Sequence, residues 1–215
     1  MKLSKYIDHT LLKADASLDS IKQLCQEAKE YDFKSVCINP CNIAFCKNEL
    51  KGSDVLVCCV IGFPLGAMSI DAKVFEAKDA ILKGADEVDM VLNIGRLKDN
   101  DLDYVTNEIR LVKQACGDKI LKVIIETCLL TDEEKINACK CIMQAGADFV
   151  KTSTGFSTNG ATFEDVKLLK DFVKDNCLIK AAGGVRNKED FMKMIELGAD
   201  RIGTSSGTKL IDKDE

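Results

Sequence analysis

Three similar stretches decide the fold: KGADEVDMV at residues 83–91, AGADFVKTS at 145–153 and LGADRIGTS at 197–205. In each of them a helix-like stretch ends at a glycine, Ala-Asp follows, and a short apolar run comes next. Glycine is common just past a helix because it adopts a left-handed backbone conformation without a Cβ penalty. The apolar run after it is typical of a buried strand. The same helix-to-strand joint therefore occurs three times, in widely separated parts of the chain.

The rest of the chain continues this alternation. Eight strands are expected, at Tyr6–Thr10, Ser35–Asn39, Val55–Ile61, Glu87–Asn93, Leu121–Thr127, Phe149–Ser153, Leu178–Ala182 and Arg201–Ser205. Helical segments separate them. One apolar helix face is expected to consist of Leu18, Ile21, Leu24, Cys25 and Ala28.

Two helix starts are marked by capping residues. Thr131 and Glu134 have the spacing of a capping box, in which the two side chains satisfy free backbone N–H groups at the helix start. Asn187 is the expected N-cap of the helix that ends near Gly198. These signals support the alternation of helices with strands.

Strands that alternate with helices indicate a parallel sheet with right-handed crossovers. Eight such units predict the α/β class and a closed (β/α)₈ TIM barrel. No Pro-rich or Gly/Ser-rich linker divides the chain, so residues 1–215 are expected to form a single domain. An open doubly wound sheet is the alternative. No G-x-G-x-x-G motif opens any helix, which argues against its dinucleotide-binding version.

Composition excludes several classes of protein. The chain has 215 residues and a net charge of -5, which disfavours a nucleic-acid surface because such a surface is basic. The longest nearly apolar run, Val55–Met68, is interrupted by glycine and proline, so no membrane partner is expected. The N-terminal sequence MKLSKYIDHT carries charges where a signal peptide is apolar. We therefore expect a cytoplasmic protein.

Eleven cysteines are present, and a reducing compartment would leave them as free thiols. Cys37, Cys41 and Cys46 lie close together in the sequence, and so do Cys139 and Cys141. A metal cluster is one interpretation, although no paired C-x-x-C spacing occurs and His9 is the only histidine. The other interpretation is that these cysteines are small side chains of the hydrophobic core. Cys37 is assigned such a packing role.

Ionisable residues interrupt three of the apolar strands. They are Asp89 in EVDMVLN, Lys151 in DFVKTST and Lys180 in LIKAAGG. The active site of a barrel lies at the carboxyl ends of its strands, so such residues are candidates for chemistry. Lys122 and Glu126 lie nearer the ends of their strand and are given a structural role.

Two lysines on consecutive strands indicate a particular chemistry. Each alone could reach solvent along its stem or pair with a carboxylate for structural reasons. Together, a second ammonium group and desolvation favour a neutral amine, which attacks a carbonyl to form a Schiff base. A carboxylate such as Asp89 and the second lysine then transfer protons.

Glycine clusters follow the last two predicted strands, at Gly183–Arg186 and Gly203–Gly207. Barrels often bind phosphate with the loops after strands seven and eight. Glycines let backbone N–H groups approach the phosphate oxygens, and Ser205 and Ser206 add hydroxyl donors. Each cluster alone is explained by turn formation, whereas both together predict a phosphate-bearing ligand.

These residues resemble the deoxyribose-phosphate aldolase family of class I aldolases, which have a (β/α)₈ barrel. The resemblance is spread over nearly the whole chain. It rests on IDHTLL (7–12), VIGFPLG (60–66), EVDMVLNIG (87–95), KVIIET (122–127), VKTSTGF (150–156), KAAGGVR (180–186) and RIGTSSG (201–207).

The resemblance implies roles for particular residues. Lys151 matches the Schiff-base lysine, Lys180 matches the second lysine that assists proton transfer, and Asp89 matches the proton-exchanging aspartate. The implied substrate-binding residues are Asp8, Thr10, Thr152, Gly183, Gly184, Gly203, Ser205 and Ser206. The implied reaction cleaves 2-deoxy-D-ribose 5-phosphate reversibly to acetaldehyde and glyceraldehyde 3-phosphate, without a metal or organic cofactor.

The resemblance also implies a homodimer. The chain departs from some relatives in its C-terminus, where only TKLIDKDE follows RIGTSSG, so any step that needs a longer tail is in question. Two alternatives to the aldolase remain. One is a transaldolase-like lysine enzyme that uses a ketone donor, and the other is a non-catalytic phosphosugar-binding barrel.

Overall fold

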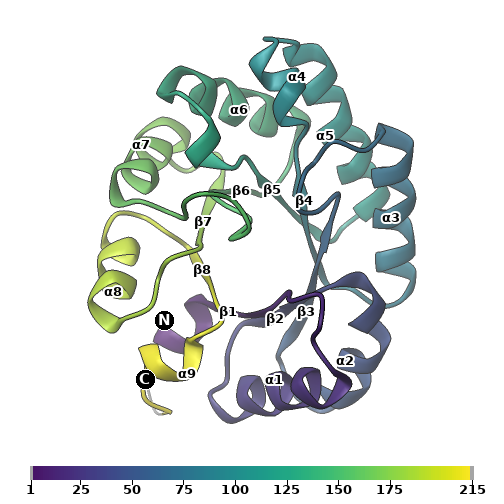
Figure 1. Cartoon of the computed structure of the whole chain (residues 1–215), viewed down its shortest axis with the longest axis vertical. Helices are drawn as coiled ribbons and strands as arrows, with labels where there is room; N and C mark the ends of the chain where they lie inside the picture. Colours follow the sequence, from purple (N-terminus) through teal and green to yellow (C-terminus); the bar gives the residue numbers. More distant parts are fainter. Residues whose placement is uncertain (1, 214–215) are drawn as a thin grey trace.

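Eight parallel strands close into one barrel, in the order β1 to β8, with β8 pairing back to β1 (Figure 1). The computed structural model describes residues 2–213. The strands are β1 (Ile7–Leu11), β2 (Ser35–Ile38), β3 (Leu56–Ile61), β4 (Glu87–Val91), β5 (Ile120–Ile124), β6 (Phe149–Lys151), β7 (Leu178–Ala182) and β8 (Arg201–Thr204). The predicted TIM barrel and all eight predicted strands are confirmed, and the open sheet is excluded. The largest difference in bounds is in β5, which ends at Ile124 rather than at Thr127.

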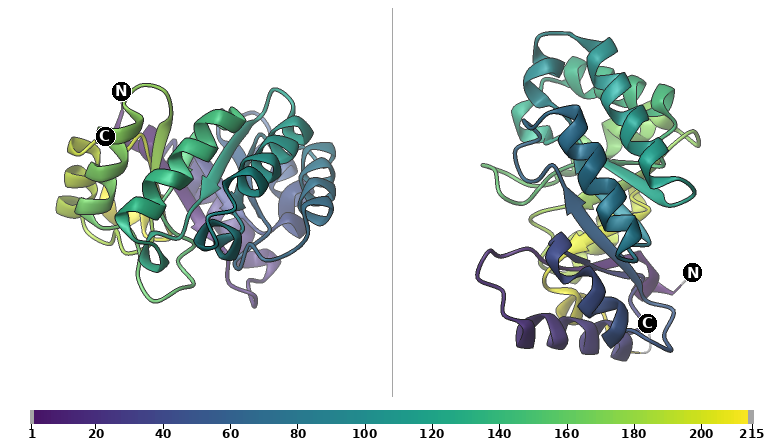
Figure 2. Two further views of the ribbon diagram at one scale, coloured as in Figure 1. Left: turned by 90° about the horizontal axis from the view of Figure 1, so that it is seen from above. Right: turned by 90° about the vertical axis from the view of Figure 1, so that its right-hand side faces the viewer.

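Helices surround the barrel on its outside (Figures 1 and 2). The α-helices are α1 (Leu18–Glu30), α2 (Ile43–Glu49), α3 (Ile70–Leu82), α4 (Ile94–Lys98), α5 (Leu102–Cys116), α6 (Asp132–Ala145), α7 (Phe163–Val173), α8 (Lys188–Glu196) and α9 (Gly207–Leu210). Short 3₁₀ helices are η1 (Leu3–Tyr6), η2 (Pro40–Asn42) and η3 (Thr127–Leu129). Within residues 2–213, no helix has both the length and the apolar character needed to cross a membrane.

The predicted helix ends are confirmed by their hydrogen bonds. Thr131 and Glu134 form the complete capping box of α6, and Asn187 Oδ1 accepts the Asp190 backbone N–H at 2.7 Å at the start of α8. Gly146, which ends α6, has a φ of 76° and is in the left-handed conformation that glycine tolerates best. The sequence thus specifies where these helices begin and end.

One predicted core residue is exposed. Ile21, Leu24, Cys25 and Ala28 are buried beneath α1 as expected, but Leu18 is 57% exposed. Leu18 is the first residue of α1. A periodic apolar face predicts burial only where another element covers it, and the first turn of this helix is not covered at Leu18.

The two faces of the strands differ in chemistry. Outward-facing residues such as Ile7, Val57 and Met90 belong to one large apolar cluster between the barrel and the helices. The apolar cluster on the inner side consists of Leu12, Cys37, Cys58 and Val60. The remaining inner positions include seven buried charged residues: Asp8, Glu87, Asp89, Lys122, Lys151, Lys180 and Arg201. The main hydrophobic core therefore lies outside the barrel, and the barrel interior is ionic.

Candidate active site

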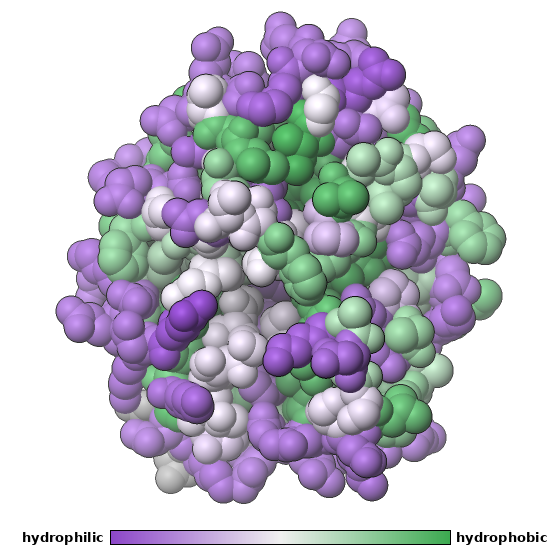
Figure 3. Space-filling model, in the orientation of Figure 1, coloured by the Kyte–Doolittle hydropathy of each residue, from purple (hydrophilic) through white to green (hydrophobic). Residues whose placement is uncertain are grey.

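A cavity of about 320 Å³ opens at the carboxyl ends of β1, β6, β7 and β8. Glycine, serine and threonine form much of its wall. The lining residues are Thr10–Lys13, Lys151, Thr154–Phe156, Ala182–Arg186 and Gly203–Ser206. In the orientation of Figure 1, weakly polar and hydrophilic residues surround a hollow near the middle of this face (Figure 3). The cavity lies where the catalytic site of a barrel is expected.

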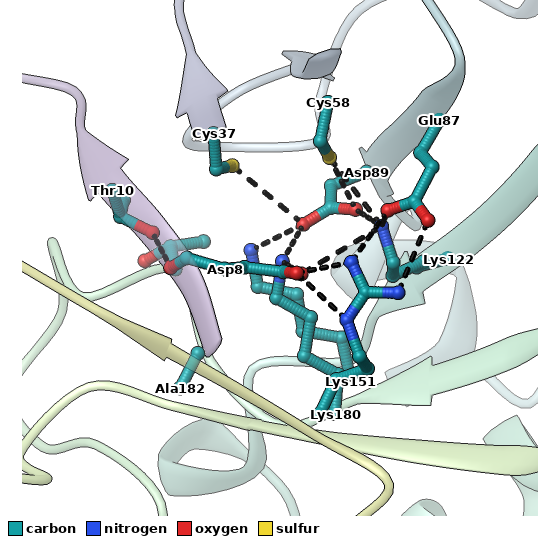
Figure 4. A network of polar contacts seen from close by, with 12 residues as sticks. Asp8, Thr10, Cys37, Cys58, Glu87, Asp89, Lys122, Lys151, Lys180 and Ala182 are labelled. Carbon is teal, nitrogen blue, oxygen red and sulfur yellow. Dashed lines mark hydrogen bonds and ion pairs between the residues drawn. The ribbon is translucent and has the colours of Figure 1, made fainter. Parts of the chain in front are cut away.

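Asp89 lies beneath this cavity and contacts three lysines (Figure 4). Its Oδ2 accepts hydrogen bonds from Lys151 Nζ at 2.8 Å and from Lys180 Nζ at 2.7 Å. Its Oδ1 accepts a hydrogen bond from Lys122 Nζ at 2.9 Å. Lys151 and Lys180 are paired in register on β6 and β7, which brings their stems side by side. The three polar strand residues predicted from the sequence are therefore brought together.

A second layer of ion pairs joins the opposite wall of the barrel to this group. Arg201 on β8 donates from Nε to Asp8 Oδ1 at 2.7 Å and from Nη1 to Glu87 Oε1 at 3.1 Å. Lys122 Nζ donates to Glu87 Oε2 at 2.6 Å, and Lys180 Nζ lies 2.5 Å from Asp8 Oδ2. Each of these cations contacts two or more carboxylates. The charges thus form one connected network rather than separate pairs.

The network contains more cations than carboxylates. Lys122, Lys151, Lys180 and Arg201 are the four cations, and the three carboxylates are Asp8, Glu87 and Asp89. With every group ionised, four positive and three negative charges leave a net charge of +1 among these buried groups. An uncompensated buried charge is costly, so the arrangement of the individual ion pairs matters.

Local ion pairs decide which groups keep their charge. Burial would raise the pKa of Asp89, but the ammonium groups of Lys122, Lys151 and Lys180 outweigh it and hold that pKa well below its usual value. Burial would likewise lower the pKa of Lys180, but the carboxylates of Asp8 and Asp89 raise it instead. Asp89 is therefore held as a carboxylate and Lys180 as an ammonium group.

Six of the eight predicted substrate-binding residues line the cavity: Thr10, Gly183, Gly184, Gly203, Ser205 and Ser206. The other two, Asp8 and Thr152, are fully buried beneath it. Asp8 contacts Arg201, Lys180 and Ser35. Thr152 Oγ1 joins β6 to β7 by accepting the Ala182 N–H at 3.1 Å. Asp8 and Thr152 therefore contact other protein groups and support the residues that line the cavity.

Sequence reasoning missed part of the network. Lys122 and Glu126 were expected to share a structural role near the strand ends, but they do not act together: Lys122 contacts Asp89 and Glu87 inside the barrel, and Glu126 contacts Thr154. Arg201 and Glu87 were not singled out. The signal that identifies them is strand alternation, since Glu87 is two residues before Asp89 and Arg201 is two residues before Gly203.

Glu126 holds together the loops after β5 and β6. Its backbone is left-handed, with a φ of 56°, and its carboxylate accepts the Thr154 backbone N–H at 3.2 Å and the Thr154 hydroxyl at 2.5 Å. Thr154 lines the cavity three residues after Lys151. This contact fixes the cavity wall beside the lysine.

A buried ion pair outside the barrel supports the end of β4. Lys73 on α3 donates to Glu108 on α5 at 2.7 Å and to the Val91 carbonyl at 2.8 Å. Glu108 also accepts the Asn93 backbone N–H at 2.9 Å. Val91 is two residues after Asp89, so this pair fixes the strand that carries the central carboxylate.

All eleven cysteines are unpaired thiols. The Cys37, Cys41 and Cys46 group does not converge, because Cys41 is exposed while Cys37 faces the barrel interior. Cys37 was assigned to packing, and its Sγ also lies 3.9 Å from Asp89 Oδ2. Cys58 lies closer still, at 3.1 Å from Asp89 Oδ1. Two thiols therefore adjoin the central carboxylate.

Comparison with known proteins agrees with this geometry over the whole barrel. Residues 2–210 match the family model described as DeoC/LacD family aldolase. The chain is 61% identical to a deoxyribose-phosphate aldolase of Finegoldia magna, over 99% of this chain and 100% of that protein. It is 59% identical to the corresponding enzyme of Streptococcus uberis, over 99% of this chain and 96% of that one.

A solved structure extends the comparison to three dimensions. The tetrameric deoxyribose phosphate aldolase from Aeropyrum pernix superposes with a TM-score of 0.86 at 33% identity, covering 97% of this chain and 88% of that chain. The fold and the family match, which covers residues 2–210, lead to the same assignment. The chain belongs to the DeoC/LacD family of aldolases.

Proposed function

We propose that this chain is a deoxyribose-phosphate aldolase that cleaves 2-deoxy-D-ribose 5-phosphate reversibly to acetaldehyde and D-glyceraldehyde 3-phosphate. One observation carries the proposal: Lys151 and Lys180 share a single oxygen of Asp89 directly beneath a cavity rich in glycine and hydroxyl groups. Identities of 61% and 59% to two deoxyribose-phosphate aldolases, each over 99% of this chain, support the substrate.

Lys151 is assigned as the nucleophile. Of the three lysines around Asp89, it is Lys151 that lines the cavity, while Lys122 and Lys180 are fully buried. The Lys151 nitrogen attacks the aldehyde carbon of the open-chain sugar, and loss of water from the carbinolamine gives a protonated Schiff base.

Asp89 and Lys180 are assigned to proton transfer. Asp89 Oδ2 contacts both lysine nitrogens, so it is placed to pass protons between them and a water molecule during carbinolamine dehydration. Lys180 remains a cation because Asp8 and Asp89 raise its pKa against the effect of burial.

Carbon–carbon cleavage follows from the Schiff base. A base removes the proton of the C3 hydroxyl, the C2–C3 bond breaks, and its electron pair flows into the iminium. Glyceraldehyde 3-phosphate leaves, and the enamine that remains on Lys151 is protonated at carbon. Hydrolysis of the resulting Schiff base then releases acetaldehyde and restores the lysine.

The loops after β7 and β8 are assigned to the phosphate. Gly183 and Gly184 have φ values of 79° and 90°. Glycine adopts this left-handed conformation far more readily than other residues. Gly203, Ser205 and Ser206 lie across the same cavity, and Arg186 adds a cation to its wall. Backbone N–H groups, hydroxyls and a guanidinium group are the usual donors to a phosphate dianion.

Asp8 and Thr152 are assigned supporting roles beneath these groups. We extend the proposal to a homodimer in the cytoplasm. The family resemblance is the basis for both, although the relative from Aeropyrum pernix is a tetramer. Light scattering of the purified protein tests the homodimer, since a dimer doubles the 23.6 kDa mass of the chain.

The experiment that tests the function is reduction with borohydride in the presence of acetaldehyde, followed by peptide mass mapping. We expect an ethyl adduct on Lys151, and none in Lys151→Arg, whose guanidinium cannot act as a neutral amine. The matched control is Lys135→Arg, on α6 outside the site. An adduct on Lys180 would reverse the two lysine roles.

The same measurement separates the two alternatives. Trapping with dihydroxyacetone in preference to acetaldehyde would identify a transaldolase-like enzyme. Phosphosugar binding by folded protein without trapping or turnover would identify a non-catalytic barrel. The intact set of Asp89, Lys151 and Lys180 argues against the latter.

A further inference from the structure

Two thiols and a carboxylate meet inside the barrel beneath the cavity. The Sγ atoms of Cys37 and Cys58 and one carboxylate oxygen of Asp89 all lie within 4.8 Å of one another, and all three residues are fully buried. Cys58 Sγ is 3.1 Å from Asp89 Oδ1, and Cys37 Sγ is 3.9 Å from Asp89 Oδ2 (Figure 4). The proposed aldolase mechanism uses neither thiol.

The barrel itself holds these thiols together. Cys37 on β2 and Cys58 on β3 are partners in register. Both belong to the inner apolar cluster, whereas the next residue, Cys59, belongs to the outer core. Asp89 comes from β4, where its partner on β3 is Val60, two residues past Cys58. Three consecutive strands thus present one donor each to the same point.

These separations fit a thiophilic metal ion. Zinc binds cysteine sulfur at about 2.3 Å and carboxylate oxygen at about 2.0–2.2 Å in a tetrahedral arrangement, which separates two sulfurs by about 3.8 Å and a sulfur from an oxygen by about 3.5 Å. Here Cys58 Sγ is 3.1 Å from one Asp89 oxygen and Cys37 Sγ is 3.9 Å from the other, and the two sulfurs and one carboxylate oxygen lie within 4.8 Å of one another. Adjustment of these side chains would complete three of the four ligand positions.

We propose that Cys37, Cys58 and Asp89 form an inhibitory site for a thiophilic divalent cation of the zinc and cadmium class. Such an ion replaces the two thiol protons, forming two metal–sulfur bonds and releasing two protons. It also takes the Asp89 carboxylate away from Lys151 and Lys180. Inhibition rests on the proposed aldolase function, whereas binding of the ion does not.

The charge of the network is compatible with this exchange. Lys122, Lys151 and Lys180 surround Asp89 and oppose a bare cation. One divalent ion in exchange for two protons leaves the total charge unchanged.

The ion has a short route to the site. Lys151 lines the cavity, and its Nζ lies 2.8 Å from Asp89 Oδ2. Movement of this one flexible side chain opens the Asp89 carboxylate to the cavity. A hydrated ion can then exchange its waters for the three donors.

The experiment titrates the full chain with Cd²⁺, with thiols reduced and oxygen excluded, and follows the ultraviolet charge-transfer absorption of cadmium thiolates. The parent protein carries Cys41→Ser, because Cys41 is the exposed cysteine of the chain. Overnight incubation allows slow entry. We expect one Cd²⁺ per chain, competition by Zn²⁺, and inhibition of 2-deoxyribose 5-phosphate cleavage that a chelator reverses.

Three variants locate the site. Cys58→Ala and Cys37→Ala should each weaken Cd²⁺ binding by about tenfold or more, and should weaken inhibition equally when each is compared with its own metal-free rate. Cys59→Ala is the matched control, since it removes the neighbouring thiol on the outer face of β3. Two independent thiol variants allow the test even if one fails to fold.

Two results would overturn the proposal. One is the absence of cadmium-thiolate absorption after overnight incubation. The other is equal binding in the parent and in Cys58→Ala, which would place the ion elsewhere. Binding with the expected cysteine dependence but in a protein without aldolase activity would uphold the metal site and reject the proposed function instead.

Discussion

The outer and inner faces of the same eight strands follow opposite rules. On β4, Val88 and Met90 point outward into an apolar cluster, while Glu87 and Asp89 point inward to cations. Outward residues each contribute burial of apolar area, which is non-directional and tolerant of exchange. Inward residues depend on particular partners, because a buried charge is acceptable only when it is compensated.

This difference separates stability from chemistry. The outer cluster is extensive enough to hold the barrel closed, with helices covering it on all sides (Figures 1 and 2). The interior can then hold buried charged side chains that do not themselves stabilise the fold. The interior thus holds three lysines around one carboxylate, and a lysine amine is the nucleophile of a Schiff-base enzyme.

Asp89→Asn should break the inner face most severely. It removes the oxygen shared by Lys151 and Lys180 and the partner of Lys122. We expect the rate of 2-deoxyribose 5-phosphate cleavage to fall by about 10²–10⁴-fold, the usual contribution of acid–base catalysis. A coupled assay of glyceraldehyde 3-phosphate measures it. A variant within threefold of the native rate would remove Asp89 from the mechanism.

Glu87→Gln and Met90→Leu compare the two faces on one strand. Glu87 contacts Lys122 and Arg201, so its neutralisation leaves two buried cations short of a partner and should destabilise the fold by about 3–5 kcal/mol. Met90→Leu conserves volume on the outer face and should cost less than about 1.5 kcal/mol. Urea unfolding measures both free energies. Equal losses would show that the two faces obey the same rule.

Gly203→Ala should sharpen the comparison by adding one methyl group to the inner face. A Cβ at this position would lie 3.1 Å from Lys180 Cε and 3.1 Å from Ala182 Cβ, so Lys180 must move slightly. Because a misplacement near 1 Å can cost about 10²-fold in rate, we expect kcat to fall by about tenfold. Steady-state kinetics measure kcat and KM, with Gly95→Ala on α4 as the control. An unchanged kcat would show that Lys180 tolerates displacement.

His9→Gln should have the smallest effect, which depends on pH. His9 points outward from β1 to Glu27 on α1, with 2.7 Å between Nε2 and Oε2, and burial lowers its pKa despite that contact. Below pH 6.5 the unfolded chain then binds more protons than the folded chain, so stability falls as pH decreases. The slope is at most about 1.4 kcal/mol per pH unit.

The measurement is the free energy of unfolding at pH 6.5, 5.7 and 5.0. His9→Gln keeps a side chain able to reach Glu27 but cannot titrate, so it should flatten the curve. Because His9 is the only histidine, the difference between the slopes of the two proteins isolates its titration. The same slope in both proteins would contradict the assignment.

The sequence by itself predicted the order of the elements and the three central residues. Repeated glycine joints gave the rhythm of helix and strand, and mid-strand charges in otherwise apolar runs identified Asp89, Lys151 and Lys180. These features are local, since they depend on backbone conformation at a glycine or on the contrast between one residue and its neighbours. The family motifs added the substrate expected of that arrangement.

The tertiary structure alone decided which groups meet. Arg201 reaches Asp8 and Glu87 across the barrel, and Lys122 joins Asp89 rather than Glu126, because closure and register set the neighbours of each inward side chain. Strand alternation tells which face a residue occupies, but not which residue of another strand stands opposite. For the same reason the sequence did not predict that Cys37, Cys58 and Asp89 lie together, because their contact depends on the register of three strands.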